Sequence, residues 1–204
     1  GFKRLDRLTT DDFLEVRVGK FASTPAKLEK ITRTHDTNTE QVTFPPKMNL
    51  DLARLLGYFV AEGNLQFAGG TYRLKFFNTD PEVKDDIVRL GKRLFHVTPN
   101  VRIDSNKCYE VSFNSILLGR WWIKNFGYQK GSLHKELPRP IRQSPKEFLF
   151  EFLRGYLTDA FVGRQSRKKG VTEFAVKFTS NSKRLLQHIQ VMLFACGFPA
   201  KLQR

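Results

Sequence analysis

The chain has 204 residues, of which 40% are hydrophobic and 27% are charged, and a formal net charge of +15 at pH 7. This length allows a sizeable core in one domain or two small ones, and the charge indicates a polyanionic partner, nucleic acid above all. Two cysteines without zinc-ligand spacing exclude a disulfide framework and favour a reducing compartment. No apolar run reaches membrane-spanning length, so we expect no membrane partner and a cytoplasmic, nucleoid-associated location.

Residues 1–45 differ from the rest of the chain. The alternation from Phe13 onward predicts a strand over 11–18. A turn or loop is expected over 19–30, and the polar, threonine-rich stretch 31–44 predicts an extended segment with few core residues. Two interpretations stay open for this part: an arm that becomes ordered on DNA, or a linker from a neighbouring domain.

An apolar helix ending in a carboxylate and a glycine is predicted over 50–63, with Asn49 as its N-cap. Gly57 and Ala61 are four residues apart and share one face, which allows the backbone of a second helix to approach closely. Glu62 would then lie at the mouth of a helix pair, and Gly63 would permit a sharp exit. The apolar residues at helical spacing are Leu52, Leu55, Leu56, Phe59 and Val60.

Two strands, 64–67 and 71–77, are predicted to form a hairpin about the turn at 68–70. A helix then starts at Asp80-Pro81 and runs to about Phe95, with Val83, Ile87, Leu90 and Leu94 facing inward. Strands over 97–104 and 107–113, a helix over 115–126 and a linker over 127–143 follow. Trp121 and Trp122 are adjacent, so we expect one in the core and the other against the second half of the chain.

The second half repeats this order. Ser144-Pro145-Lys146-Glu147 predicts a capping box for a helix over 145–159. A basic loop over 163–170, a strand over 171–178 and a helix over 183–196 follow. Gly155 follows Gly57 by 98 residues, and the segment at Lys177 follows the similar segment at Lys75 by 102. These similar offsets predict an internal duplication whose second copy is short at its C-terminus.

Leu55 to Gly63, LLGYFVAEG, resembles the nine-residue LAGLIDADG motif of homing endonucleases. FLRGYL followed by TDAFV is similar to the second motif of single-chain members, especially archaeal intein-borne ones. The resemblance covers 46–204. It implies an α+β, pseudo-twofold duplicated αββαββ(α) fold, with two central motif helices flanked by two antiparallel DNA-binding sheets. We therefore expect an arm or linker at 1–45, a first repeat at 46–126, an inter-repeat linker at 127–143 and a second repeat at 144–204.

The same resemblance implies a monomeric, site-specific endonuclease that hydrolyses both strands of a long, nonpalindromic double-stranded DNA target in intron or intein homing. Its metal, Mg²⁺ or Mn²⁺, would be held by Glu62, by a partner acid, and by main-chain oxygen at Gly63. Lys75 and Lys177, at matching places in the two repeats, are the candidate catalytic lysines. The candidate DNA contacts are Arg73, Lys75, Asn78, Arg102, Lys107, Arg164, Arg167, Lys168, Lys169 and Lys177.

Two interpretations remain for the second metal-binding acid, the partner of Glu62. In register with Glu62, the expected position is 160, which is alanine, whereas Asp159 stands one residue earlier. Either a tightened helix end presents Asp159 to the metal, or the second acid is lost. The lost acid favours an alternative function, a catalytically inactive DNA-binding protein or an RNA maturase. A basic ribosome-associated protein is a third reading, but it does not account for paired small-faced helices.

Overall fold

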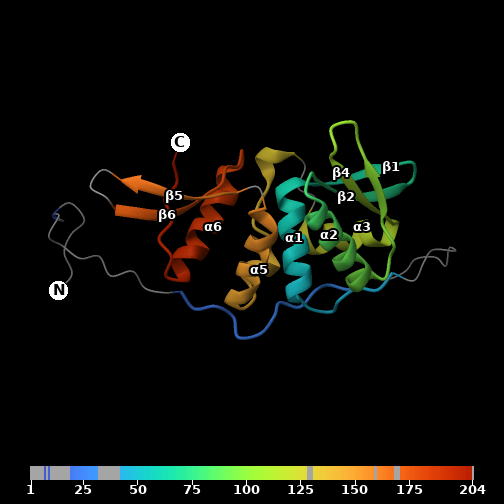
Figure 1. Ribbon diagram of the computed structural model, residues 1–204. Coiled ribbons are helices and arrows are strands. Elements are labelled where there is room, and N and C mark those ends of the chain that lie inside the picture. Colours follow the sequence, from blue (N-terminus) through green and yellow to red (C-terminus); the bar gives the residue numbers. More distant parts are fainter. Residues whose placement is uncertain are drawn as a thin grey trace.

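The computed structural model of the chain places two neighbouring helices at its centre and a β-sheet on either side of them (Figure 1). It describes residues 7, 9, 19–31, 42–127, 131–158, 160–167 and 171–203, with the backbone alone at 164–167 and 171–175. Within these ranges, no helix combines the length and apolar character that crossing a membrane requires. The predicted strand at 11–18 lies outside the described residues.

The first repeat contains three helices and a four-stranded antiparallel sheet of strand order β1-β2-β4-β3. Its hairpin turns at Gly69 and Gly70, whose φ angles of 61° and 75° lie in the left-handed region that glycine adopts without strain. The elements are α1 (Leu50–Glu62), β1 (Gly63–Ala68), β2 (Thr71–Asn78), α2 (Pro81–Phe95), β3 (Asn100–Ile103), β4 (Tyr109–Asn114) and α3 (Ile116–Phe126). The predicted order of elements in this half is confirmed.

Local chemistry fixes the ends of these helices. The Asn49 side chain accepts a hydrogen bond from the Leu52 backbone N–H at 2.8 Å, which confirms the predicted cap of α1. Asp80 caps α2 in the same way. Gly63, after α1, has extended backbone with φ −96°, so glycine is not required there for its conformation. It is required for space, because a Cβ atom would lie 2.4 Å from the Phe59 carbonyl oxygen.

The core of the first repeat is aromatic, and both adjacent tryptophans belong to it. Trp121 and Trp122 are each completely buried. The expected contact of one of them with the second half of the chain stays a prediction. Trp121 stacks on Phe44 with ring centroids 5.1 Å apart, and Trp122 meets Phe59 edge-on at 4.9 Å. Both flanks of α3 are buried because the chain segment before α1 covers the flank that α1 leaves free.

The second repeat is smaller and has a two-stranded sheet. Its elements, with the segment leading into it, are η2 (Ser132–His134), α4 (Arg139–Arg142), α5 (Lys146–Tyr156), β5 (Phe161–Arg167), β6 (Val171–Lys177) and α6 (Lys183–Ala195). The motif helix α5 ends at Tyr156, three residues before the predicted end. Residues 163–167, predicted as loop, belong to β5.

The predicted capping box of α5 is wrong. Pro145 occupies the N-cap position, and no side chain caps the helix. The Ser144 hydroxyl instead donates to the Pro140 carbonyl at 2.7 Å and accepts from the Ala26 N–H at 3.0 Å. Ser144 is completely buried, so its hydroxyl is used to attach an earlier segment of the chain rather than to start the helix.

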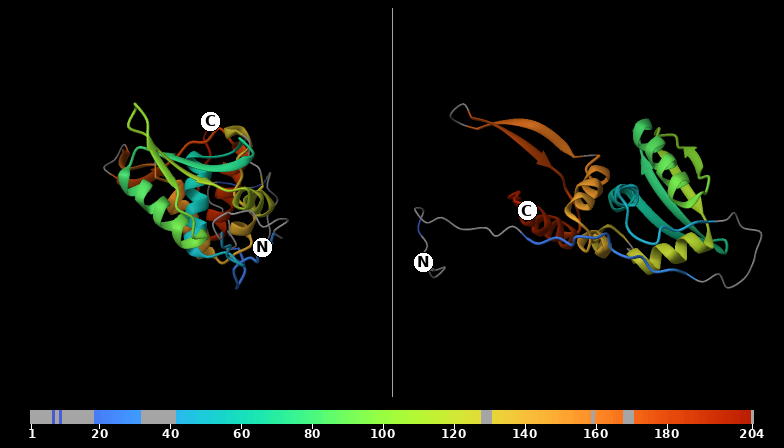
Figure 2. Two further views of the ribbon diagram at one scale, coloured as in Figure 1. Left: turned by 90° about the vertical axis from the view of Figure 1, so that its right-hand side faces the viewer. Right: turned by 90° about the horizontal axis from the view of Figure 1, so that it is seen from below.

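That earlier segment, residues 19–31, we call the strap. It runs past the ends of α5 and α1 that lie away from the sheets, and it contacts both repeats (Figures 1 and 2). Gly19 donates to the Ala195 carbonyl of α6 at 3.1 Å, and the Glu29 N–H donates to the Asn125 side chain of α3 at 2.8 Å. The strap is therefore folded onto the side opposite the sheets.

Candidate active site between the two repeats

Two glycines meet where α1 crosses α5. A Cβ atom added to Gly57 would lie 2.1 Å from the Phe152 carbonyl oxygen, and one added to Gly155 would lie 2.2 Å from the Arg54 carbonyl oxygen. Neither distance is compatible with a side chain, so the two backbones are in direct contact. The predicted packing of small faces is confirmed. It brings the C-terminal ends of both motif helices to one place.

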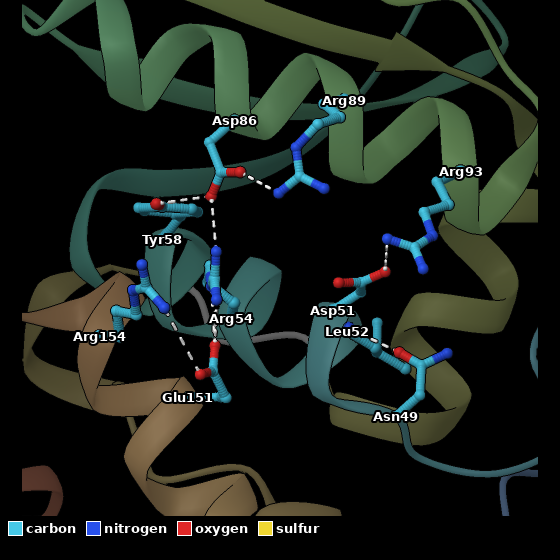
Figure 3. Close-up of polar contacts among 10 residues, drawn as sticks. All are labelled: Asn49, Asp51, Leu52, Arg54, Tyr58, Asp86, Arg89, Arg93, Glu151 and Arg154. Carbon is cyan, nitrogen blue, oxygen red and sulfur yellow. Dashed lines mark hydrogen bonds and ion pairs between the residues drawn. The ribbon is translucent and has the colours of Figure 1, made fainter.

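A polar network fixes how the two helices are placed along each other (Figure 3). Arg54 of α1 donates through Nε and Nη2 to Glu151 of α5, at 2.8 and 2.6 Å, and its Nη1 lies 3.5 Å from Asp86 of α2. Asp86 also accepts hydrogen bonds from Tyr58, at 2.9 Å, and from Arg89. Burial alone would raise the pKa of Asp86, but Arg89, Tyr58 and Arg54 together hold it below its ordinary value.

A cavity of about 310 Å³ opens where the two motif helices end. Glu62 from the end of α1 and Ala160 from the turn after α5 both line it, as their matching register predicts. Polar groups from the second repeat and the inter-repeat segment complete its wall. The lining residues are Val60, Ala61, Glu62, Ser132, Lys135, Tyr156, Ala160, Phe178, Thr179, Ser180 and Asn181.

Lys135 is the cation of this cavity. Its Nζ donates a 2.6 Å hydrogen bond to the Ala61 carbonyl, next to Glu62. Burial lowers the pKa of Lys135, and the negative charge of Glu62 opposes that shift. Burial also raises the pKa of Tyr156; a hydrogen bond from Ser180 counteracts this, and the charge of Glu62 adds to it. Glu62 therefore acts electrostatically on both neighbours.

Lys135 was not among the predicted site residues, because it lies in the segment predicted to be a linker. One available signal was the apolar pair Leu137 and Ile141 in that segment. Both side chains are completely buried, so the segment packs on the core and holds its polar residues in fixed positions.

The cavity has one carboxylate among the described residues, Glu62, which is exposed to solvent. Asp159 lies outside the described residues, and the described residues contain no group of three or more potential His, Cys, Asp or Glu ligands. Mg²⁺ is commonly bound by one or two carboxylates together with substrate phosphate oxygens. Glu62 and the neighbouring hydroxyls fit such a site when a phosphate supplies the remaining ligands.

Neither Lys75 nor Lys177 lines the cavity. The Lys75 Nζ lies 3.1 Å from each carboxylate oxygen of Glu110. Gly63 pairs with Phe76 in the first repeat, whereas Phe161, which follows Ala160, pairs with Lys177 in the second. Strand register therefore matches Lys177 with Phe76, and the expected equivalence of the two lysines is wrong.

Several predicted DNA contacts lie on the face of the four-stranded sheet that points away from the helices. Arg73, Lys75 and Arg102 share this face by strand register. Lys107 is exposed in the β3–β4 turn with φ 58°, and Lys177 is exposed at the end of β6. Asn78 is on the opposite face, where its side chain accepts from the Asp80 N–H at 2.8 Å.

The remaining predicted contacts belong to the second sheet. The side chains of Arg164 and Arg167, and all of Lys168 and Lys169, lie outside the described residues. They stay sequence-based predictions.

A family model matches the second repeat. Residues 147–204 match the family model of the LAGLIDADG-like domain. This part of the chain is a LAGLIDADG-like domain, and the resemblance to the LAGLIDADG family seen in the sequence is confirmed. The matched segment begins inside α5 and covers the second repeat, including the turn that holds Ala160. The first LAGLIDADG motif identified in the sequence is α1, the helix that packs on α5.

Curated relatives of this chain include DNA polymerases of Thermococcus. A DNA polymerase of Thermococcus kodakarensis is 32% identical over 127 residues, which are 55% of this chain and 6% of that protein. The DNA polymerase II large subunit of the same species is 28% identical over 148 residues, 71% of this chain and 8% of that protein. The chain thus spans less than a tenth of the length of these relatives.

The fold is that of a LAGLIDADG protein of known structure. The crystal structure of I-DmoI in complex with DNA and Mn superposes with a TM-score of 0.50 at 17% sequence identity, covering 76% of this chain and 83% of that one. At this identity the likeness concerns the fold: two central helices with an antiparallel sheet on each side.

Proposed function

We propose that the chain is a metal-dependent DNA endonuclease of the LAGLIDADG type, acting as a monomer on a long, nonpalindromic duplex. The observation that carries the proposal is the cavity at the ends of the two glycine-packed helices, where Glu62 and Lys135 meet between two unequal sheets. The I-DmoI structure that shares the fold contains DNA and Mn. The unequal sheets support an asymmetric target.

The sheets supply the surface for the duplex. Both lie toward the end of the helix pair at which β1 leaves α1 (Figure 1), and Glu62 of the cavity lining is the last residue of α1. Arg73, Lys75 and Arg102 place cations on the outward face of the larger sheet. Contacts of this kind to phosphates make affinity fall steeply with salt, whereas a β-ribbon in the major groove reads base edges.

The cavity residues divide the chemistry between them. Glu62 presents its carboxylate to the solvent at the mouth and would hold Mg²⁺ or Mn²⁺, which when bound supplies an activated water and neutralises charge on the scissile phosphate. Lys135, fixed by its hydrogen bond to the Ala61 carbonyl, faces the same place. Its ammonium stabilises the negative charge that develops on the phosphate oxygens. Tyr156 retains its proton near Glu62 and remains a hydrogen-bond donor.

Cleavage of duplex DNA tests the proposal. Binding sites are first selected from a randomised duplex library and then cloned into a plasmid, which is incubated with Mg²⁺ or with EDTA. We expect Mg²⁺-dependent cleavage that is lost in Glu62→Gln and lowered roughly a hundredfold in Lys135→Met, while both variants bind the selected site. Full cleavage by Glu62→Gln would overturn the assignment of the site.

Ala160 favours a second candidate function, a LAGLIDADG protein that binds DNA, or the RNA of its host intron, without cutting. Its methyl group lines the cavity where the pseudo-twofold partner of Glu62 is expected. Salt-sensitive binding without any Mg²⁺-dependent cleavage would support this function. Nicking of one strand would instead show that the half containing Glu62 works alone.

The relatives support an intein-borne origin as part of the same proposal. Two differently named polymerases of one species match this chain over 6% and 8% of their lengths. A small segment shared by different host proteins is what an inserted endonuclease domain produces. Expression of the matched polymerase genes tests this: excision of the segment from the precursor is expected, and its retention in the mature polymerase would contradict it.

A further inference from the structure

A lysine–carboxylate pair occupies the outward face of the larger sheet. The Nζ of Lys75 lies 3.1 Å from both carboxylate oxygens of Glu110. Lys75 is on β2 and Glu110 on β4, diagonal to each other in the register that pairs Lys75 with Ser112 and Phe77 with Glu110. The two side chains are 16% and 27% exposed, so the pair is packed in one geometry and still reaches the surface.

Glu110 is unusual for its position. Strand register places Arg73, Lys75 and Arg102 on the same face, and Glu110 is the one acid on that face among the described residues of the four strands. A carboxylate on a surface that meets phosphates is repelled by them unless it has a donor to bind. The major groove offers such donors, the amino groups of cytosine and adenine.

The pair matches the edge of a base pair. In a Watson–Crick pair the keto oxygen of one base and the amino group of the other are joined by a hydrogen bond, so they lie about 2.9 Å apart. A cation and a carboxylate 3.1 Å apart can face those two groups together. Lysine has three N–H donors and a carboxylate about four acceptor sites, so each group can keep its partner and still bind a base.

The lysine and the carboxylate prefer different bases, so the pair can distinguish G·C from C·G. Guanine presents N7 beside its O6 keto oxygen, which makes it the preferred base for a lysine, whereas cytosine presents its amino group to a carboxylate. We propose that Lys75 and Glu110 together read one G·C base pair of the target in a single orientation, with Lys75 on guanine and Glu110 on cytosine. This inference rests on the proposed binding of duplex DNA.

Exchange of the two charges tests the direction of reading. The double variant Lys75→Glu/Glu110→Lys keeps an ion pair at the same place but reverses its order. Duplexes are selected by binding from a randomised library in Ca²⁺, so cleavage does not enter the measurement. We expect one position of the selected sequence to change from G·C to C·G, with a preference of roughly tenfold in each protein.

Two further variants make the result decisive. Glu110→Ala is expected to relax the preference at the same position and leave the rest of the sequence unchanged. The matched control exchanges Lys124 and Glu29, an ion pair of 3.2 Å between α3 and the strap, and is expected to change no position. A wild-type protein that selects no sequence would refute the proposed function. If wild type selects a sequence that charge exchange and Glu110→Ala leave unchanged, the base-pair reading alone is overturned.

Discussion

The two repeats share their motif helices and differ in what surrounds them. In the first, α2 buries Ile87, Leu90 and Phe95 beneath four strands. In the second, the corresponding helix α6 buries Leu185 and Ile189 and leaves Val191 64% exposed, and Val162 on the two-stranded sheet is 70% exposed. The two repeats are therefore most alike at the motif helices α1 and α5 and differ most in their sheets and outer helices.

This difference shows that the position of the candidate active site and the extent of the DNA-facing surface depend on different parts of the fold. The position of the candidate active site depends on the contact between α1 and α5, which is reciprocal and almost equal from both sides. The extent of the DNA-facing surface depends on the sheets, which are unequal. A half with fewer strands can still place its part of the site, while offering fewer side chains to a target.

The largest effect is expected where the repeats are most alike. Gly57→Ala and Gly155→Ala each put a methyl group about 2 Å from a backbone oxygen of the other helix, and a backbone atom cannot rotate away. We expect each to lower the free energy of unfolding by about 4 kcal/mol, measured by urea denaturation. Gly70→Ala is the control, at about 1 kcal/mol from its left-handed φ alone. Clearly different losses in the free energy of unfolding for the two variants would contradict an equal contact of α1 and α5 from both sides.

The chemical difference between the repeats can be removed by one substitution. Ala160→Asp places a carboxylate in the cavity at the position matching Glu62. We expect cleavage of the second strand to rise roughly a hundredfold, seen as conversion of nicked to linear plasmid. Thr158→Asp is the control that adds the same charge to the same turn outside the cavity lining. An unchanged rate in Ala160→Asp would indicate that Asp159 already supplies the second acid.

The polar network around Asp86 belongs to the first repeat but reaches the second through Arg54. Asp86→Asn is expected to lower the free energy of unfolding by about 2 kcal/mol at pH 7. Because the folded-state pKa of Asp86 is lowered, its contribution is complete above the unfolded value near 3.9 and is lost as pH falls through the folded value. Unfolding measured from pH 7 to pH 2 checks this: the difference between wild type and variant should shrink only below about pH 4.

The strap gives the smallest expected effect. Ser144→Ala removes the hydroxyl that joins the strap to the start of α5. We expect a loss of about 1 kcal/mol in the free energy of unfolding, together with faster hydrogen exchange at the Ala26 amide. Ser23→Ala, an exposed serine of the strap, is the control. Unchanged exchange at Ala26 would contradict the role of Ser144 in attaching the strap.

Local chemistry predicted much of the fold. Helix caps at Asn49 and Asp80 and the glycine turn at Gly69-Gly70 act over a few residues, so the sequence reveals them. Ser144 shows the limit of such patterns: it fits a capping box, but its hydroxyl is used by Ala26, which is 118 residues away in sequence. The burial of Trp121 likewise depends on a distant part of the chain, because Phe44, which stacks on it, comes from the segment before α1.

The candidate site was predicted at its helix ends and missed beyond them. Glu62 and the register of Ala160 follow from the duplicated motif, which the sequence contains. Lys135 depends on the path of a segment without a periodic pattern, and Glu110 becomes significant only when strand register places it among cations. Side chains brought together by topology rather than by spacing are the ones that sequence reasoning did not find.

The contact between Gly57 and Gly155 has a consequence for how proteins of this kind are recognised. The two glycines hold the halves together whether or not an acid follows them, so a copy that loses its catalytic residue still needs them to fold. The motif can therefore be retained in a protein that has lost its catalytic activity. A genome survey based on the nine-residue pattern detects the packed helix pair. An active nuclease should be inferred only after the residue at the eighth position of the pattern, Glu62 in this chain, has been checked in each copy.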